Sequence, residues 1–579
     1  MSYEVRNARP VDVLLISHFE DVGLFDTEVA PGPWLARANA SGSGSAGRVK
    51  DARRERQAVY VDGQCYDLAR FMSWVRYGST RHYRRFDTHT MTHLCGTYFE
   101  SFMLRSGYTL RHVNHATRFD LAALAEQIAP RYVMISTTFL PEPGAIGEVT
   151  QLVKALWPGI PVLLGGQILI EFAKIIPPHV FRDYLHQWDA DAVVISARAE
   201  SQLLAIVSHE PDELPGLQLA ATWLRQRDGT YARNALPDVQ APIDEFAVHW
   251  DALNPDTLYP IVNMRTARSC SFRCAFCSHP ANNGPFNPAT LHMVRDELDR
   301  LAGHPVIRRV AFTDDTFNVP LKRFQAVLDL IAGRGLEWSC YFRCQNATED
   351  IVKRMRDAGC SSVFLGVESI DDQVLKNMDK GGRKHHYDRG VGWLKKHGIA
   401  THANFVLGYP GAQLDCAERM IEWVDEHDVD FYCASPWYCS PATPVWRRRK
   451  EFGIVGRYYN WRHDTMTSTQ AMELDAWAVG AARRSAFISE TTSHSGWTAW
   501  FLLANGLSSD EIRTLMGLYN GLSGRDTDAE TVRAMPEFAT VKRLIEDARF
   551  PNAPDADLTM TPARSDEELA SLDQVVPAH

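Results

Sequence analysis

The sequence lacks the features that would assign it to a membrane, to the secretory pathway or to nucleic acid. It has no run of the roughly 18 apolar residues that a membrane span needs, and its start, Met-Ser-Tyr-Glu-Val-Arg, has no apolar signal core. Eleven cysteines in 579 residues, with no leader, favour a reducing compartment over a disulfide framework. The chain also has fewer basic than acidic residues, with a net charge of −10. Phosphate binding relies on Lys and Arg, so this charge argues against nucleic acid as a partner. We expect a cytoplasmic protein without a membrane or nucleic-acid partner.

Two runs depart from this shortage of positive charge. They are Arg53-Arg54-Glu55-Arg56 and Arg447-Arg448-Arg449-Lys450, and we expect both to be solvated faces. The remaining composition, with 45% apolar and 23% charged residues, is that of an ordinary globular chain. The length predicts about three or four domains.

Three of the cysteines stand close together. Cys270, Cys274 and Cys277 have the spacing C-x3-C-x2-C, with Phe276 directly before the last of them. Thiolates are the usual ligands of iron–sulfur clusters, and a cubane normally takes four. Three ligands leave one iron open, and an open metal position can bind substrate, as it does on catalytic zinc. A zinc knuckle or three unrelated core cysteines are the alternatives, but no second C-x2-C pair or fourth ligand stands out.

The spacing and the aromatic residue resemble the radical S-adenosylmethionine (SAM) superfamily. The resemblance implies a [4Fe-4S] cluster on the three cysteines, whose open iron chelates the amino and carboxylate groups of SAM. Strands and helices then alternate at intervals of roughly 30 residues, which predicts a partial (β/α)6 barrel over residues 256–445. The predicted strands are residues 261–265, 307–312, 336–342, 362–367, 400–407 and 431–435.

Polar residues follow these strands, on the side where barrel enzymes place their sites. By resemblance to the superfamily, Thr313 and Asp314 hold the SAM ammonium group. Arg343 meets the SAM carboxylate, which suits a planar guanidinium.

The next two strand ends add further SAM contacts. Glu368 and Ser369 match the position that contacts the ribose hydroxyls or the methionyl group. Asn404 and Gly408 fall near the adenine, where glycine allows close backbone approach. Each residue taken singly could be an ordinary loop cap, and their joint order favours the site.

An open α/β domain is predicted over residues 1–210. Short β-branched runs alternate with helices, which favours a parallel sheet with helices on both faces. The predicted strands are residues 11–17, 109–114, 132–136, 161–166 and 192–195. Ligands of such sheets bind at the carboxyl ends of the strands. The candidate residues at those ends are Ser136, Thr137, Thr138, Gly165, Gly166, Ser196 and Glu200.

No G-x-G-x-x-G follows the first strand, so a dinucleotide is not expected. An α/β domain before a radical SAM domain resembles the Rossmann-like cobalamin-binding domain of class B radical SAM enzymes, where strand-end Ser, Thr and paired glycines approach the corrin. The D-x-H-x-x-G motif of some cobalamin proteins is missing, because Ile16 and Asp21 stand at its Asp and Gly positions around His18. We therefore expect cobalt without a histidine from this motif, with His18 as the remaining ligand candidate.

Two further regions complete the chain. Residues 211–255 are predicted as a linker with a hairpin, because Asp228-Gly229 suits a type I′ turn. Residues 446–579 are predicted as a mainly helical domain, with helices at 473–489, 497–505 and 510–522. This domain would cap the barrel and exclude water, or serve packing alone. The substrate-pocket candidates, chosen for aromatic surface and proton handling, are Trp437, Tyr438, Trp461, His463 and Asp464.

The resemblance implies a cobalamin-dependent radical SAM methyltransferase. A reduced cluster would cleave SAM to a 5′-deoxyadenosyl radical, which removes a hydrogen from the substrate, and methylcobalamin would deliver the methyl group. The expected partners are a small-molecule or short-peptide substrate and an electron donor such as flavodoxin or ferredoxin. A non-methylating rearrangement, ring contraction or cyclisation with the same cofactors is the first alternative, and a non-catalytic cobalamin or iron–sulfur sensor is the second.

The substrate class rests on one more segment. Residues 277–286 resemble the corresponding stretch of natural-product C- and P-methyltransferases, although His279 replaces the usual aromatic. An unactivated carbon or a phosphinate phosphorus of a natural-product intermediate is therefore the expected methyl acceptor.

Overall fold

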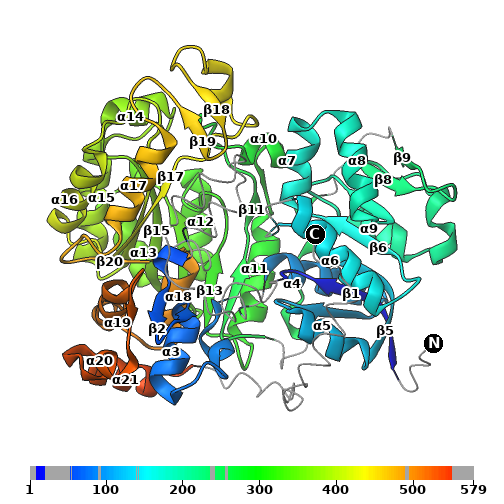
Figure 1. Cartoon of the computed structure of the whole chain (residues 1–579), viewed down its shortest axis with the longest axis horizontal. Helices are drawn as coiled ribbons and strands as arrows, with labels where there is room; N and C mark the ends of the chain where they lie inside the picture. The colour runs from blue at the N-terminus through cyan, green and yellow to red at the C-terminus, as the bar shows by residue number, and fades with distance from the viewer. Residues whose placement is uncertain are drawn as a thin grey trace. The chain divides into compact units, whose positions relative to one another are not determined.

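The computed structural model describes residues 8–19, 53, 55–88, 91, 93–138, 140, 143–234, 242–253, 258–488 and 495–550. These residues form two compact units, one from residues 8–19 and 93–253 and the other from residues 53–91 and 258–550. Each unit contains a seven-stranded sheet (Figure 1). No helix in the described part of the chain is long and apolar enough to cross a bilayer.

The first unit is built on a mostly parallel sheet in the order β4-β1-β5-β6-β7-β8-β9. Its five parallel strands are β1 (Arg9–Ile16), β4 (Leu110–Val113), β5 (Ile128–Ser136), β6 (Val162–Gly165) and β7 (Ala192–Val194). The buried segments of these strands are nearly continuous apolar runs, as expected for strands covered on both faces. All five predicted strands are therefore present.

Helices cover both faces of this sheet, and each face has its own apolar core. One core contains Val149 and Leu185 from α6 (Pro143–Leu156) and α8 (Pro178–Trp188). The other contains Met103 and Leu203 from α4 (Leu94–Arg105) and α9 (Glu200–Val207). The remaining helices are α5 (Arg118–Ala125) and α7 (Gln167–Ile175).

The second unit is built on a parallel sheet in the order β10-β13-β14-β15-β16-β17-β20. Its strands are β10 (Ile261–Met264), β13 (Arg309–Phe312), β14 (Glu337–Phe342), β15 (Cys360–Glu368), β16 (Ala400–Leu407), β17 (Phe431–Pro436) and β20 (Ala486–Phe487). The six predicted barrel strands are present, and β20 extends the sheet by a seventh, parallel strand.

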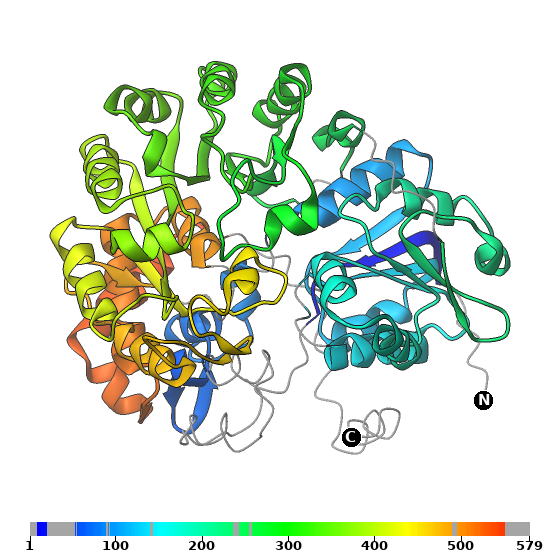
Figure 2. The same ribbon diagram turned by 90° about the horizontal axis from the view of Figure 1, so that it is seen from above.

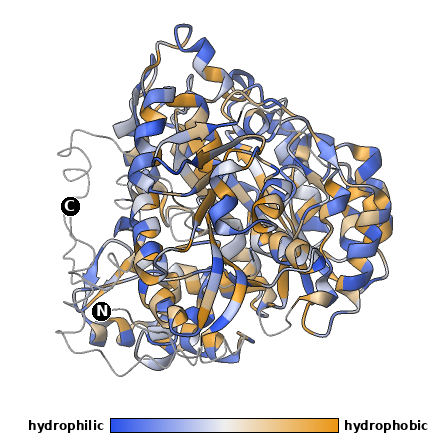
Figure 3. Cartoon of the chain, turned by 90° about the vertical axis from the view of Figure 1, so that its right-hand side faces the viewer, coloured by the Kyte–Doolittle hydropathy of each residue, from blue (hydrophilic) through white to orange (hydrophobic). Residues whose placement is uncertain are grey.

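Helices line the outside of this curved sheet (Figure 2). They are α11 (Leu291–Ala302), α12 (Leu321–Ile331), α13 (Glu349–Asp357), α14 (Asp372–Asn377), α15 (Lys384–Lys396) and α16 (Cys416–Glu426). Hydrophilic and hydrophobic colours occur together on many helices in Figure 3, as expected for helices with one face on a core. The fold is thus the mixed α/β fold that the sequence predicts.

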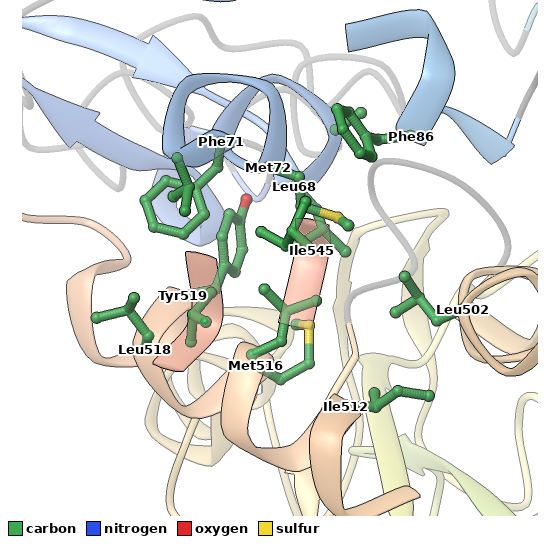
Figure 4. Close-up of a cluster of buried hydrophobic side chains, with 14 of the residues drawn as sticks. Leu68, Phe71, Met72, Phe86, Leu502, Ile512, Met516, Leu518, Tyr519 and Ile545 are labelled. Carbon is green, nitrogen blue, oxygen red and sulfur yellow. The ribbon is translucent and has the colours of Figure 1, made fainter. Parts of the chain in front are cut away.

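The C-terminal helices share their core with residues far upstream. The helix α3 (Leu68–Tyr77) packs against α19 (Ser509–Leu522) and α21 (Pro536–Asp547), and Phe71 meets Tyr519 with ring centroids 5.5 Å apart (Figure 4). The strands β2 (Val59–Val61), β3 (Gln64–Tyr66) and β21 (Asp526–Thr527) form one small sheet. Residues 53–91 therefore belong to the barrel unit and not to the predicted domain 1–210. The alternation of elements placed them wrongly because it does not reveal which core an amphipathic helix joins.

Three other expectations need correction. The hairpin of β8 (Thr222–Arg225) and β9 (Tyr231–Arg233) is present, but it continues the first sheet antiparallel to β7 and is not part of a separate linker. The predicted helix 473–489 ends early, because α17 (Ser468–Ala478) is followed by Gly480 with a left-handed φ of 70°. Arg53 is no solvated face, because it is buried and forms a bidentate ion pair with Asp475.

The predicted helical domain 446–579 also divides differently. Its helices α18 (Ser495–Ala504), α19, α20 (Ala529–Ala534) and α21 lie in the same compact unit as the barrel. Residues 551–579 lie outside the described residues.

Candidate functional site

The three-cysteine loop begins directly after the first barrel strand and is closed by a short ladder. Ala267–Arg268 (β11) pairs antiparallel with Asn287–Pro288 (β12). Ser269 adopts a left-handed φ of 64°, and its hydroxyl donates to the Gly284 carbonyl oxygen at 2.7 Å. The ladder and this bond fix both ends of the loop that carries the cysteines.

Asp314, at the end of β13, anchors the start of the loop. Its carboxylate accepts from the Thr266 N–H at 2.9 Å and from the Thr266 hydroxyl at 2.9 Å. Burial raises the pKa of Asp314 to about 6. The Thr313 hydroxyl donates to the Met264 carbonyl oxygen at 3.3 Å. The two residues predicted to hold the SAM ammonium group therefore also support the cysteine loop.

The three cysteine thiols differ in their exposure to solvent. Cys274 is buried, whereas Cys270 and Cys277 are half-buried. Burial raises the pKa of Cys277 to about 12, so this thiol stays protonated at neutral pH until a metal stabilises the thiolate. The Phe272 N–H donates to the Cys270 sulfur at 3.5 Å, and the Thr316 hydroxyl lies 3.4 Å from the same sulfur.

No group of three His, Cys, Asp or Glu side chains in the described ranges lies close enough to hold one metal ion. A cluster of several irons does not require three thiols to meet at one ion. Donors next to cysteine sulfurs are one of the features that tune iron–sulfur clusters. The loop therefore offers donors that suit an iron–sulfur cluster.

Arg343 follows β14 and lies directly beside the loop. It is 6% exposed, its guanidinium stacks 3.6 Å from the centre of the Phe272 ring, and one Nη lies 3.7 Å from the Cys274 sulfur. The other Nη donates to the Lys380 carbonyl oxygen. Its Nε has no hydrogen-bond partner among the described residues. This cation is therefore held next to the cysteine loop with one donor still available.

Glu368 lies at the end of β15, within a buried polar network. Its Oε1 pairs with Lys380 Nζ at 2.8 Å, and its Oε2 accepts from the Asn404 amide at 3.1 Å. Glu368 has a left-handed φ of 65°, next to an irregularity in the strand pairing. A Cβ at Gly366 would lie 2.7 Å from the Glu368 carboxylate, so glycine leaves room for the ion pair.

The network joins several strand ends. Asn404 belongs to β16, and its Oδ1 accepts from the Cys433 thiol of β17 at 3.2 Å. Ser369 takes a local role, because its hydroxyl accepts from the Asp371 N–H at 3.1 Å. Arg343, Glu368 and Asn404 are thus brought together, through Lys380, as a candidate site for a zwitterionic ligand such as SAM.

Lys380 was not predicted from the sequence. A lysine in a loop ordinarily lies in solvent, but this one is 5% exposed. Its only sequence signal is its position directly before the paired glycines 381 and 382, which mark a tight loop.

Gly408, after β16, is covered by aromatic residues. It has a φ of 76°, and a Cβ there would lie 2.7 Å from the Trp461 ring. The Trp461 indole donates to the Trp437 carbonyl oxygen at 2.8 Å, and His463 Nε2 meets the Gly408 carbonyl oxygen at 2.9 Å. Burial lowers the pKa of His463, which keeps the ring neutral.

The substrate-pocket candidates therefore fall into two groups. Trp437, Trp461 and His463 form a buried aromatic cluster that packs against Gly408. Tyr438 is 37% exposed and stacks on Tyr458, and Asp464 is exposed. The cluster holds the end of β16 in place, and of the five candidates only Tyr438 and Asp464 reach the surface.

In the first unit, the predicted cobalamin residues lie at the carboxyl ends of the neighbouring strands β5, β6 and β7. Ser136 of β5 pairs in register with Gly165 of β6, which is the neighbour of Val194 in β7. Thr137 is fully buried, and its hydroxyl has no hydrogen-bond partner in the described part of the chain. A Cβ at Gly166, which has a φ of 135°, would lie 2.8 Å from that hydroxyl.

The other residues at these strand ends have mixed exposure. Ser196 is buried, and its hydroxyl accepts from the Arg198 N–H at 3.0 Å. Glu200 is buried at the start of α9, whereas Thr138 is exposed. His18 stacks on His115 with ring centroids 4.9 Å apart. Glycine at position 166 is therefore what lets the chain pack this closely against the buried Thr137 hydroxyl, at the strand end predicted to bind cobalamin.

Comparison with protein families identifies part of the second unit. Residues 264–424 match the radical SAM superfamily. This match covers the cysteine loop and the strand ends that follow it. Residues 264–424 are therefore a radical SAM domain, which implies a [4Fe-4S] cluster and SAM as cofactors.

Relatives among curated proteins narrow the class. An uncharacterised methyltransferase of Pyrococcus horikoshii is 26% identical over 366 residues, which cover 60% of this chain and 75% of that protein. A hopanoid C-2 methylase of Rhodopseudomonas palustris is 25% identical over 51% of this chain and 53% of its own length. A bacteriochlorophyllide d C-12(1)-methyltransferase of Chlorobaculum tepidum is 25% identical over 35% of this chain and 46% of its own length. The chain thus spans only about half the length of the last two proteins. All three relatives are methyltransferases, which is the kind of enzyme that the sequence predicts.

A solved structure shares the fold. The radical SAM methyltransferase TsrM of Kitasatospora setae, with cobalamin and a [4Fe-4S] cluster bound, matches 77% of this chain and 75% of its own chain with a TM-score of 0.53 at 15% identity. The fold predicted from the sequence is therefore confirmed.

Proposed function

We propose that the chain is a cobalamin-dependent radical SAM methyltransferase that methylates an unactivated carbon, or a phosphinate phosphorus, of a natural-product intermediate. The observation that carries the proposal is the cysteine loop beside the buried Arg343, Glu368 and Lys380, within a radical SAM domain. A separate parallel sheet supplies an edge suited to a second large cofactor. When bound, the cluster and SAM supply radical chemistry, and methylcobalamin supplies the methyl group.

Cys270, Cys274 and Cys277 are assigned to the cluster. Arg343 is assigned to the SAM carboxylate, because its Nε is a buried donor without a hydrogen-bond partner among the residues that the structure describes. An ionised carboxylate accepts about four hydrogen bonds, and Thr266 makes three contacts with Asp314. One acceptor position of Asp314 therefore stays available for the SAM ammonium group, next to Thr313.

Glu368, Ser369 and Asn404 are assigned to the ribose and methionyl part of SAM, with Gly408 beside the adenine. In the first unit, Ser136, Thr137 and Thr138, Gly165 and Gly166, and Ser196 and Glu200 are assigned to cobalamin. The two groups of binding residues orient the cofactors and exclude water. The substrate is a small molecule or short peptide, and an external electron donor completes the system.

The proposal is tested by the fate of SAM. The reconstituted protein, given SAM and dithionite without oxygen, is expected to release 5′-deoxyadenosine. Arg343→Met should lower this yield at least about tenfold, equivalent to about 1.4 kcal/mol. Arg334→Met is the matched control, because Arg334 pairs with the exposed Asp299 on the outer helices and should leave the yield unchanged. Iron content is measured in parallel to show that the cluster is retained.

Methyl transfer is tested separately. With SAM that carries a deuterated methyl group, the reduced cobalamin of the protein should gain that methyl group. Release of 5′-deoxyadenosine without methylation of cobalamin would overturn the methyltransferase proposal in favour of a rearrangement. Failure to turn SAM over at all would favour a sensor.

A further inference from the structure

We propose that a cationic surface beside the cysteine loop is the docking site of an acidic one-electron carrier, a flavin or iron–sulfur protein. The inference rests on the proposed function, because reductive cleavage of SAM needs an electron from outside. One electron would leave the reduced carrier, which is oxidised, and enter the cluster, which is reduced, without any bond being made or broken. This surface includes the run Arg447-Arg448-Arg449-Lys450, which the sequence predicts only as a solvated face.

The surface is built around Ala275, which lies between the second and third cysteines and is fully buried. The Ala275 N–H donates to the Met378 carbonyl oxygen at 2.7 Å. The Ala275 carbonyl oxygen accepts from the Val445 N–H at 2.8 Å. Residues 376–379 and 444–451 are therefore attached directly to the loop that carries the cysteines.

These segments carry an excess of positive charge. On residues 271–277, 376–379 and 444–451, six side chains are cationic and two are acidic. We call the cationic group the loop rim, and its members are Arg273, Lys376, Arg447, Arg448, Arg449 and Lys450. The chain as a whole has a net charge of −10, so the loop rim opposes the overall sign.

The acidic residues neutralise only one member of the loop rim. Asp379 and Glu451 both pair with Arg448, at 3.7 Å and 2.6 Å. The other five cations are exposed and have no ion-pair partner within the described residues. Arg449 lies over the Trp446 ring at 5.3 Å, which holds its guanidinium in place.

An acidic carrier fits this arrangement better than other partners do. A chain with net negative charge repels an acidic protein at long range, and a local cationic surface reverses that effect where contact is needed. Exposed charges of this kind change the rate of encounter and its dependence on salt. Their position on segments bonded to the cysteine loop brings the carrier to the proposed cluster and not to a remote face.

The binding test uses oxidised bacterial flavodoxin as the probe and the full reconstituted chain. The triple variant Arg447→Glu, Arg449→Glu and Lys450→Glu should raise the Kd at least about tenfold. A matched triple variant, Arg308→Glu, Lys353→Glu and Lys396→Glu, makes the same change of net charge at exposed positions before β13 and on α13 and α15. It should leave the Kd within about twofold. Raising the salt from about 50 to about 200 mM should weaken binding of the wild type much more than that of the loop-rim variant.

The reduction test separates docking from chemistry. Reduced flavodoxin should reduce the cluster of the loop-rim variant at least about tenfold more slowly than that of the wild type. Dithionite, which needs no docking surface, should reduce both equally and yield equal 5′-deoxyadenosine. Equal loss of binding in both triple variants, or no loss in either, would overturn the proposal, as would an RNA oligonucleotide that displaces flavodoxin from the loop rim. Absence of SAM cleavage with dithionite would instead count against the proposed function itself.

Discussion

Thr137 shows how a single buried side chain can indicate a missing ligand. Its hydroxyl is fully buried and has no partner among the described residues. Leaving a buried polar group unsatisfied costs about 1–3 kcal/mol. Gly166 packs directly against this hydroxyl, because a Cβ there would lie 2.8 Å from it.

Thr137→Val therefore has opposite expected effects on stability and on binding. Without cobalamin, the variant should be as stable as the wild type or about 1 kcal/mol more stable, because an unsatisfied hydroxyl is removed. Its affinity for hydroxocobalamin should fall several-fold, as measured by equilibrium dialysis. Ser208→Ala, on a hydroxyl at the end of α9 that bonds the Ala205 carbonyl oxygen, is the control. Unchanged cobalamin affinity in Thr137→Val would remove Thr137 from the cobalamin site.

Glu100 and His112 predict a pH dependence. Glu100 of α4 lies 3.9 Å from His112 of β4, whose Nε2 lies 2.8 Å from the Ser17 hydroxyl. A Cβ at Gly96 would overlap the His112 ring, so glycine makes room for it. Burial raises the pKa of Glu100 to about 7 and lowers that of His112 to about 3.

The sign for Glu100 follows from linkage. Because the folded state binds the Glu100 proton more tightly than the unfolded state does, its contribution to stability is full below about pH 4.5 and is lost as the pH rises through about 7. Glu100→Gln should therefore gain stability relative to the wild type between pH 5 and pH 8, by up to about 3 kcal/mol. Urea unfolding at the two pH values measures this change. A difference between variant and wild type that does not vary with pH would contradict the assignment.

Helix α3 is the element that shows which hydrophobic core residues 53–91 join. Phe71 is fully buried against Tyr519 of α19. Phe71→Ala should cost about 3–5 kcal/mol and should increase amide exchange in α19 and α21. Strands β1 and β5 of the other unit should keep their protection. Phe181→Ala, in α8 of the first unit, is the matched control and should show the reverse pattern. Loss of protection from amide exchange in β1 after Phe71→Ala would contradict this assignment and would indicate that residues 53–91 pack with the first unit.

Elements buried on both faces could be predicted well from the sequence. Runs such as Val162–Gly165 and residues 310–312 are apolar throughout, which leaves few other structures open. The end of α17 was placed too late in the chain, because the short strand β20, which lies within the predicted helix, is defined only by its pairing with β17. The partner of α3 could not be placed, because an amphipathic pattern shows that a face is buried but not against what.

The site was predictable to a similar extent. The cysteine spacing located the loop, and strand ends located Arg343, Glu368 and Asn404. Lys380 was not predictable, since its burial depends on the ion pair with Glu368, which only the fold creates. The hydrogen bond from Thr266 to Asp314 was not predictable either, since only the fold brings these two residues together.

The whole molecule combines two proposed cofactor-binding units in one chain. One unit offers three thiols beside a buried cation network, and the other offers a parallel sheet edge with an orphaned hydroxyl. Each unit has its own core, so a change at one set of binding residues should leave the other cofactor in place.

The most direct measurement is anaerobic reconstitution of the full chain with iron, sulfide and hydroxocobalamin, followed by metal analysis and spectra. We expect about four irons and about one cobalt per chain, and we expect a Cys274→Ala variant to lose the iron but keep the cobalt. Iron without cobalt would contradict the proposed cobalamin-dependent function, because it would leave a radical SAM enzyme whose first unit has another purpose.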